Sequence, residues 1–188
     1  CVPDAVCNVM EQNGFSVSRK KPSGVGTYTH RSWDYVITLC KEAGALGVMS
    51  SYNDYDGEPI TGSYHFLTEI LRQEWGFKGY VVSDSEAVEF ISSKHKVANT
   101  YEDGIAQAVN AGLNIRTHFT PPADFILPLR KAVADGKISQ ETLDKRVAEI
   151  LRVKFWLGLF DNPYRGNGKQ AEQIVHSKEH QAVSLEAA

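Results

Sequence analysis

The sequence has no hydrophobic run that approaches the roughly 20 residues of a membrane-spanning helix, so nothing in it predicts a membrane protein. Neither sign of charge is in large excess, since 20 Lys and Arg stand against 23 Asp and Glu, for a net charge of −3. A chain with this balance and a pI near 6.1 lacks the basic surface that binding to nucleic acid or an anionic membrane requires. Neutral molecules are compatible partners. No signal peptide is recognisable, but the chain opens with Cys1 and not Met, so a periplasmic or secreted location is left open.

Cysteine is scarce, because the chain contains only Cys1, Cys7 and Cys40. An odd number of cysteines cannot form a complete set of disulfides, and this spacing matches no zinc site. The histidines show no ligand set either, and all except His118 are assigned to the surface. Asp54 and Asp56 lie in a polar stretch with a glycine, which a turn explains more simply than a cation loop. We therefore predict no metal and no other cofactor.

From residue 31 onwards, short apolar stretches alternate with amphipathic ones. Apolar residues recur at helical spacing before residue 44 and again over residues 64–75, and a glycine follows each stretch. Three short apolar segments have the character of buried strands, at residues 46–50, 80–83 and 113–116. This alternation predicts an α/β fold with a parallel sheet.

The last third of the chain contains a helix, a linker and a second helical stretch. Ser139 is expected to cap the first helix by its hydroxyl alone, because the residue three positions later is Thr142 and not an acid. Residues 162–168 have the composition of a linker, and residues 172–188 resemble a helix. We therefore divide the chain into a poorly defined N-terminal segment (1–30), a main domain (31–161), and a linker with a helical segment (162–188).

Five stretches of the main domain carry recognisable motifs. Four of them read GVMSSYN at 47–53, LTEILRQEWGF at 67–77, GYVVSD at 79–84 and NAGLN at 110–114. The fifth joins ILRVKF to GLFD within residues 150–161. Together and in this order, they resemble the VMxSYN, LTxxLRxEWGF, G(F/Y)VVSD, AGLD and exit segments of glycoside hydrolase family 3, with Asn114 in place of the Asp. The combination spans residues 31–164 and is far more specific than any single motif.

The resemblance implies that residues 31–161 are the C-terminal part of a (β/α)8 barrel, that is, an incomplete TIM-barrel-like domain. It also implies that residues 162–188 are a linker and the start of a truncated second domain. Because a full barrel needs about 250 residues, we expect the chain to be a fragment or a truncated gene product. The resemblance also implies a retaining exo-glycosidase of the β-glucosidase kind, which hydrolyses terminal β-linked sugars of an oligosaccharide or glycoside through a covalent glycosyl-enzyme intermediate and needs no cofactor. The alternative is a non-catalytic sugar-pocket fragment that self-associates or is structural only.

Asp84 directly follows the predicted strand at 80–83, at the end of a barrel strand where catalytic groups are placed. Retaining glycosidases need one carboxylate that attacks the anomeric carbon and a second carboxyl group about 5.5 Å away that protonates the leaving oxygen. The resemblance implies that Asp84 is the nucleophile. The structural alternative is an Asp that caps the following helix.

The resemblance places Met49 and Tyr52 near the sugar, where the tyrosine would hydrogen-bond the carboxylate and stack on the pyranose. Their alternative is an ordinary core or rim position. Arg116 comes at the end of the third strand and is expected either to line the pocket mouth or to be a surface residue paired with an acid. Glu86 is expected to orient neighbouring groups or to be a solvated acid at the start of a helix, and its place on the loop of Asp84 makes it a poor general acid.

Other features of the family are missing or changed. The family's sugar-binding Lys-His pair lies on an earlier strand, whereas Lys94-His95 follows the strand of Asp84. Many members carry Trp after the nucleophile, where this chain has Ser85. The general acid of the family usually comes from its second domain or a later loop. We therefore expect weak catalysis by this chain alone.

An open sheet predicts association. Three parallel strands with helices on their outer face cannot close a barrel, which leaves the inner face and two strand edges uncovered. We place Val48, Val81 and Ile115 near this uncovered region. Self-association into a homo-oligomer is therefore expected.

Overall fold

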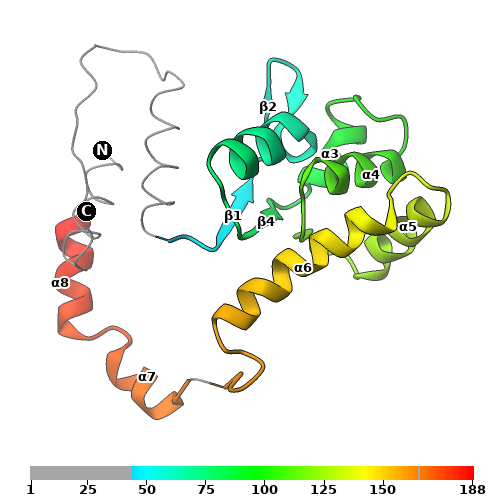
Figure 1. Ribbon diagram of the computed structural model, residues 1–188. Coiled ribbons are helices and arrows are strands. Elements are labelled where there is room, and N and C mark those ends of the chain that lie inside the picture. Colours follow the sequence, from blue (N-terminus) through cyan, green and yellow to red (C-terminus); the bar gives the residue numbers. More distant parts are fainter. Residues whose placement is uncertain (1–43, 165) are drawn as a thin grey trace. The chain divides into compact units, whose positions relative to one another are not determined.

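The computed structural model describes residues 44–164 and 166–188 (Figure 1). The chain divides into two compact units, of which one is Ala45–Gly158 and the other includes Leu159–Ala188. The helix predicted before residue 44, the segment 1–30 and all three cysteines lie outside the described residues. The candidate site lies in the unit Ala45–Gly158.

Two of the three predicted strands form a parallel pair. Strand β1 (Gly47–Ser50) lies beside β4 (Tyr80–Ser83), with Gly47 opposite Tyr80 and Ser50 opposite Ser83. The third predicted strand, 113–116, is reduced to one parallel bridge between Ile115 and Val82. It is shorter than predicted because Asn114 and Ile115 both donate to the main-chain oxygen of Val81, which interrupts a regular ladder.

The connection from β1 to β4 contains a hairpin and a helix. Strands β2 (Asp54–Tyr55) and β3 (Glu58–Pro59) pair antiparallel around Asp56 and Gly57, both of which have positive φ. An Asp-Gly pair is typical of such a turn, so the polar turn predicted here is confirmed. After η1 (Ile60–Gly62), the predicted helix appears as η2 (His65–Glu74), whose hydrogen bonds join residues five positions apart, as in a π-helix.

Four helices follow β4 within this unit. They are α3 (Ala87–Ser93), α4 (Tyr101–Ala111), α5 (Ala123–Ala134) and α6 (Gln140–Trp156). The hydroxyl of Ser139 accepts from the N–H of Thr142 at 3.0 Å, so the predicted cap of α6 is confirmed. Thr100 caps α4 in the same way.

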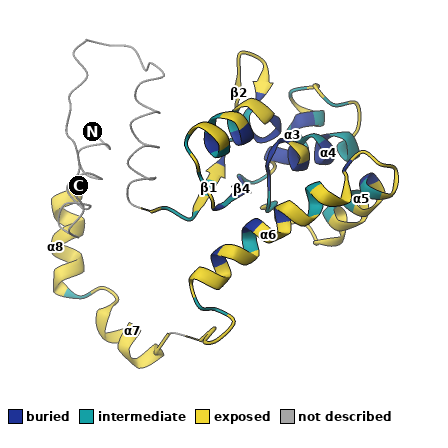
Figure 2. Cartoon of the chain, in the orientation of Figure 1, coloured by how far each residue is buried: buried dark blue, intermediate teal, exposed yellow. Residues whose placement is uncertain are grey.

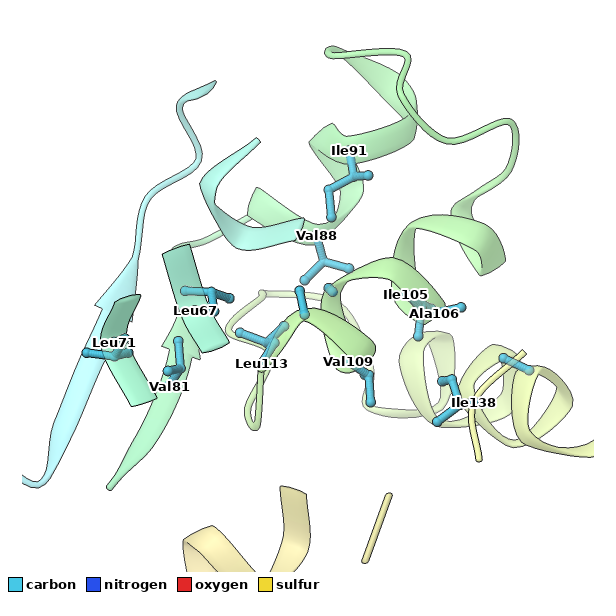
Figure 3. Packing of buried hydrophobic residues seen from close by; sticks show 13 residues of the cluster. Leu67, Leu71, Val81, Val88, Ile91, Ile105, Ala106, Val109, Leu113 and Ile138 are labelled. Carbon is cyan, nitrogen blue, oxygen red and sulfur yellow. The ribbon is translucent and has the colours of Figure 1, made fainter. Parts of the chain in front are cut away.

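The core lies between β4 and the helices packed on its outer face. Leu67 and Leu71 of η2 pack over Val81, beside residues of α3, α4 and the following turn (Figure 3). Each large apolar side chain that is removed from water here contributes roughly 1.5–3 kcal/mol. Val81 is 0% exposed, so its predicted place near the uncovered face is wrong. The reason is the two-residue period of a strand, which turns Val81 toward the helices and its neighbour Val82 the other way.

The opposite face of the sheet is more open to solvent. Strand β1 is largely exposed, whereas β4 is buried or intermediate (Figure 2). Met49 lies opposite Val82 in the register and is 64% exposed, whereas Ser50, next to it, is buried. In a closed barrel, side chains on this face fill the interior. Met49 and Val82 therefore lie on the uncovered inner face of the sheet.

The second described stretch contains α7 (Gly168–Ile174) and α8 (Lys178–Ala187), in which no described residue is buried. The single helix predicted over 172–188 is thus two helices, because α7 ends at Ile174 and α8 begins at Lys178. His176 has a positive φ, and Ser177 starts α8 by accepting from the N–H of His180 at 3.3 Å. Across the described residues, no helix is both long and apolar enough to cross a membrane.

Candidate active site

Asp84 lies in the turn that joins β4 to α3. Its N–H donates to the main-chain oxygen of Ser50 at 3.0 Å, and its own main-chain oxygen accepts from Ala87 at 3.2 Å. The carboxylate Oδ1 accepts from the N–H of Ser85 at 2.6 Å. Helix α3 is preceded by Glu86, so Asp84 is not its cap, and the capping interpretation is wrong. Main-chain hydrogen bonds stabilise the turn, and the partly exposed carboxylate of Asp84 makes no capping bond to α3.

The end of β4, next to Asp84, is held to the segment of Ile115 and Thr117 by two hydrogen bonds. Ser83 is 1% exposed, and its hydroxyl accepts from the N–H of Thr117 at 2.9 Å. Its main-chain N–H donates to Ile115 at 2.8 Å. The carboxyl ends of β1, β4 and the Ile115 segment therefore lie side by side, as in the catalytic edge of a barrel.

Tyr52 follows β1 at this same edge. Tyr52 is 44% exposed, and its ring packs edge-on against Phe90 of α3, with ring centres 6.3 Å apart. The ammonium group of Lys94 lies 6.0 Å from the Tyr52 ring centre. Met49 and Tyr52 are thus both exposed, one on the inner face of β1 and the other on the loop that leaves it.

Arg116 is largely buried and engaged by an acid. Its side chain is 7% exposed, its Nε donates to Glu89 Oε1 at 2.7 Å, and its Nη2 donates to Thr120 at 2.9 Å. The Tyr101 hydroxyl donates to the same Glu89 oxygen at 2.8 Å. The other oxygen of Glu89 is buried without a hydrogen-bond partner among the described residues. Arg116 is therefore paired with an acid, as one of its two interpretations predicted, but its side chain is buried and not at the surface. The pair joins α3 to the end of the third strand.

Glu89 was not predicted from the sequence as a site residue. The only signal was an acid in the first turn of the helix after Asp84, a position that helix dipoles favour for ordinary reasons. Glu86, which was predicted, is exposed, and its carboxylate lies 4.0 Å from His118 Nε2. His118 also lies 3.9 Å from Glu89, so these groups form the rim beside the turn of Asp84.

The Tyr101 contact should make stability sensitive to alkali. Burial, together with the hydrogen bond to the Glu89 carboxylate, raises the pKa of the Tyr101 hydroxyl above its ordinary value. The unfolded chain then loses this proton at lower pH than the folded chain, so the free energy of unfolding should fall as the pH rises above about 10. Urea unfolding at several alkaline pH values measures this fall. The Tyr101→Phe variant should show a shallower fall, and equal slopes in the two proteins would contradict the assignment.

A buried polar cluster lies at the opposite end of the strands. Glu149 of α6 is 4% exposed, and its Oε2 accepts from Arg146 at 2.9 Å and lies 3.2 Å from Nη2 of Arg72. The amide of Asn114 donates to the same oxygen at 2.7 Å. Burial lowers the pKa of Arg72 to about 10, against the opposing effect of Glu149, so Arg72 is still charged at neutral pH. The Glu149 carboxylate is therefore the shared counter-charge of two buried guanidinium groups, those of Arg72 and Arg146.

Asn114 joins this cluster to the sheet. Its Oδ1 accepts from the N–H of Val81 at 2.7 Å and from Arg72 at 2.8 Å, and its Nδ2 donates to the main-chain oxygen of Arg146 at 2.8 Å. Arg72 also donates to the main-chain oxygen of Gly79, just before β4. An amide can accept and donate at once, which an ionised Asp cannot do. Residues at the amino ends of barrel strands serve stability, and this cluster lies there.

No group of His, Cys, Asp and Glu that could hold a metal ion occurs among the described residues. The chemistry available at the edge is that of a carboxylate, Asp84, with an aromatic ring and polar side chains at the same edge of the sheet. Residues 35–153 match the glycosyl hydrolase family 3 N-terminal domain. The chain belongs to glycosyl hydrolase family 3. The predicted fold class, a TIM-barrel-like α/β domain present in part, is confirmed.

Relatives of this family 3 chain act on different sugars according to their names. A xylan 1,4-β-xylosidase of Xylanibacter ruminicola is 37% identical over 126 residues, which are 67% of this chain and 14% of the relative. A periplasmic β-glucosidase of Salmonella typhimurium is 33% identical over 154 residues, 78% of this chain and 20% of the relative. The solved β-glucosidase of Listeria innocua in complex with glucose has a TM-score of 0.71 and 29% identity, over 81% of this chain and 20% of that chain. The chain thus spans about a fifth or less of these proteins.

Proposed function

We propose that the chain carries the nucleophile half of a retaining exo-glycosidase site, with Asp84 as the attacking carboxylate. The observation that carries this proposal is the position of Asp84. It directly follows a central parallel strand, its backbone is held by Ser50 and Ala87, and its side chain does not cap α3. A carboxylate presented in this way, within a family 3 match, suits attack on an anomeric carbon.

In the proposed reaction, a carboxylate oxygen of Asp84 forms a bond to the anomeric carbon as the bond to the leaving oxygen breaks. The leaving oxygen takes its proton from a general acid. Water then attacks the anomeric carbon of the glycosyl ester and gives a proton to the conjugate base of that acid, and Asp84 leaves as a carboxylate. Glu86 is poorly placed as the acid because it belongs to the same turn as Asp84. We leave the acid unassigned.

The proposal gives the remaining predicted residues roles in binding. Met49 and Tyr52 line the sugar pocket, where the exposed Tyr52 ring can stack on a pyranose. Arg116 and Glu86 lie at its mouth, with Arg116 contributing by holding Glu89. The sugar removed is a terminal β-linked glucose or xylose, since relatives are named β-glucosidases and β-xylosidases.

The remaining proposals concern context. We infer that residues 31–161 are the C-terminal part of the barrel domain, that 1–30 precede it, and that 162–188 form a linker and the start of a second domain. We further propose a periplasmic or secreted location, as the name of the Salmonella typhimurium relative suggests. No cofactor is required, since carboxylates alone perform this chemistry.

Turnover of aryl glycosides tests the proposed function. We expect slow hydrolysis of 4-nitrophenyl β-glucoside or β-xyloside, and slower hydrolysis of cellobiose or xylobiose. Activated phenols leave with little proton help, whereas a sugar leaving group loses roughly 10²- to 10⁴-fold without a general acid. Efficient cleavage of the disaccharides by pure chain would contradict the weak-catalyst prediction. Release of nitrophenol from neither glycoside would overturn the proposed function.

The alternative function, a sugar-pocket fragment that self-associates, rests on the exposed inner face. Met49 is 64% exposed there, and apolar residues of α6 such as Phe155 are also exposed. We expect the purified chain to form dimers or larger assemblies, because burying such surface is favourable. Light scattering over a range of protein concentrations measures this. A monodisperse monomer of high thermal stability would show that the inner face is protected within one chain.

A further inference from the structure

His95 lies directly beyond the last turn of α3, and its imidazole reaches the loop of Tyr52. Its side chain is 8% exposed, so its predicted place on the surface is wrong. The ring Nε2 lies 2.9 Å from the main-chain oxygen of Tyr52. The other ring nitrogen, Nδ1, lies 3.6 Å from the Asp54 carboxylate. One imidazole therefore contacts both ends of the segment Tyr52–Asp54.

The Tyr52 carbonyl determines which ring nitrogen of His95 carries the hydrogen. A carbonyl oxygen can only accept, so Nε2 carries the hydrogen and donates it to Tyr52. The Tyr52 carbonyl is thereby tied to a residue whose own N–H donates to Phe90 at 2.8 Å. Phe90 also packs against the Tyr52 ring. The end of α3 thus holds Tyr52 at both its main chain and its side chain.

The neighbours of Tyr52 are held separately. Thr61 donates to the main-chain oxygen of Ser51 at 2.8 Å, and Ile60 donates to that of Asn53 at 3.1 Å. The carbonyl of Tyr52 alone, between these two, is assigned to His95. Loss of the imidazole should therefore release Tyr52 while β1 and the hairpin stay in place.

We propose that His95 is a positioning residue, which sets the orientation of the Tyr52 ring at the sugar-binding edge through the bond from Nε2–H to the Tyr52 carbonyl. This inference rests on the proposed function, because it takes Tyr52 as a sugar contact. A purely structural histidine would tie α3 to the loop for stability alone. The two roles differ in one respect: a positioning residue affects sugar affinity only while the Tyr52 ring is present.

The first measurement needs no sugar. Hydrogen–deuterium exchange of the Tyr52 and Asn53 amides, followed by NMR, is compared in the wild-type chain and in two variants, His95→Leu and His95→Gln. Leu removes the donor, whereas the Gln amide keeps an N–H donor of similar reach. We expect roughly 3- to 10-fold faster exchange in His95→Leu, the factor for one lost hydrogen bond, and near-normal exchange in His95→Gln. Normal exchange in His95→Leu would overturn the proposal.

The second measurement is a double-mutant cycle on sugar affinity, by NMR titration with methyl β-glucoside and methyl β-xyloside. In the wild-type background, His95→Leu should weaken binding by roughly 3- to 10-fold, and in the Tyr52→Ala background by less than about 2-fold. His95→Gln should restore the wild-type affinity. Equal weakening in both backgrounds, or none in either, would overturn the positioning role. Binding of neither sugar by wild-type chain would count against the proposed function, and the exchange comparison would still decide whether His95 holds Tyr52.

Discussion

Replacing Asp84 by Asn should remove nearly all turnover of aryl glycosides, by a factor on the order of 10⁴ or more, as for other covalent nucleophiles. The folded structure should survive the change. The backbone bonds of Asp84 to Ser50 and Ala87 do not involve its side chain, and an Asn oxygen can still accept from Ser85. Rates with 4-nitrophenyl glycosides and thermal unfolding of the same preparation measure the two effects.

A matched control is Asp56→Asn. This substitution removes the same charge, but Asp56 lies in the exposed hairpin turn, where its positive φ also suits Asn. This variant should keep the wild-type rate. Wild-type turnover by folded Asp84→Asn would exclude Asp84 as nucleophile. A 2-fluoro-glycoside, followed by peptide mapping, should place the covalent label on Asp84 directly.

Of the substitutions proposed for this chain, Glu149→Gln should cause the largest loss of stability, about 3–5 kcal/mol in the free energy of unfolding. The substitution removes the carboxylate that serves Arg72 and Arg146, and it leaves two buried guanidinium groups without a counter-charge. Urea unfolding followed by circular dichroism measures the change in midpoint. A simultaneous fall in aryl glycoside turnover is not expected at temperatures where the variant is still folded, because the cluster lies at the amino ends of the strands.

The control for Glu149 comes from the same helix. Glu141 is exposed in the first turn of α6, so Glu141→Gln should cost less than about 1 kcal/mol. A loss for Glu149→Gln as small as that for Glu141→Gln would show that the two cations find other partners or water. A triple replacement of Arg72, Arg146 and Glu149 by Met, Leu and Leu should recover part of the stability, since it removes the charges together.

The sequence alone determined the elements whose signals are local. The apolar runs before Ser50 and before Asp84 predicted β1 and β4, and helical spacing predicted η2 and α6. Strand pairing is then constrained, because parallel strands joined by a helical crossover place their carboxyl ends at one edge. The order of the elements along the chain therefore predicts that Asp84 and Tyr52 share one edge of the sheet.

The tertiary structure alone decided which polar groups meet. Arg116 and Glu89 are 27 positions apart in the chain, Arg72 and Asn114 are 42 apart, and His95 lies 43 from Tyr52. Such pairs carry no periodic signal, because their contact depends on how far each helix extends and on which way the following turn points. The same is true of Val81, whose place under the helices follows from the register of β4 and not from its apolar character. Local periodicity therefore determined the frame of the site, and the path of the backbone decided the contacts that hold its side chains.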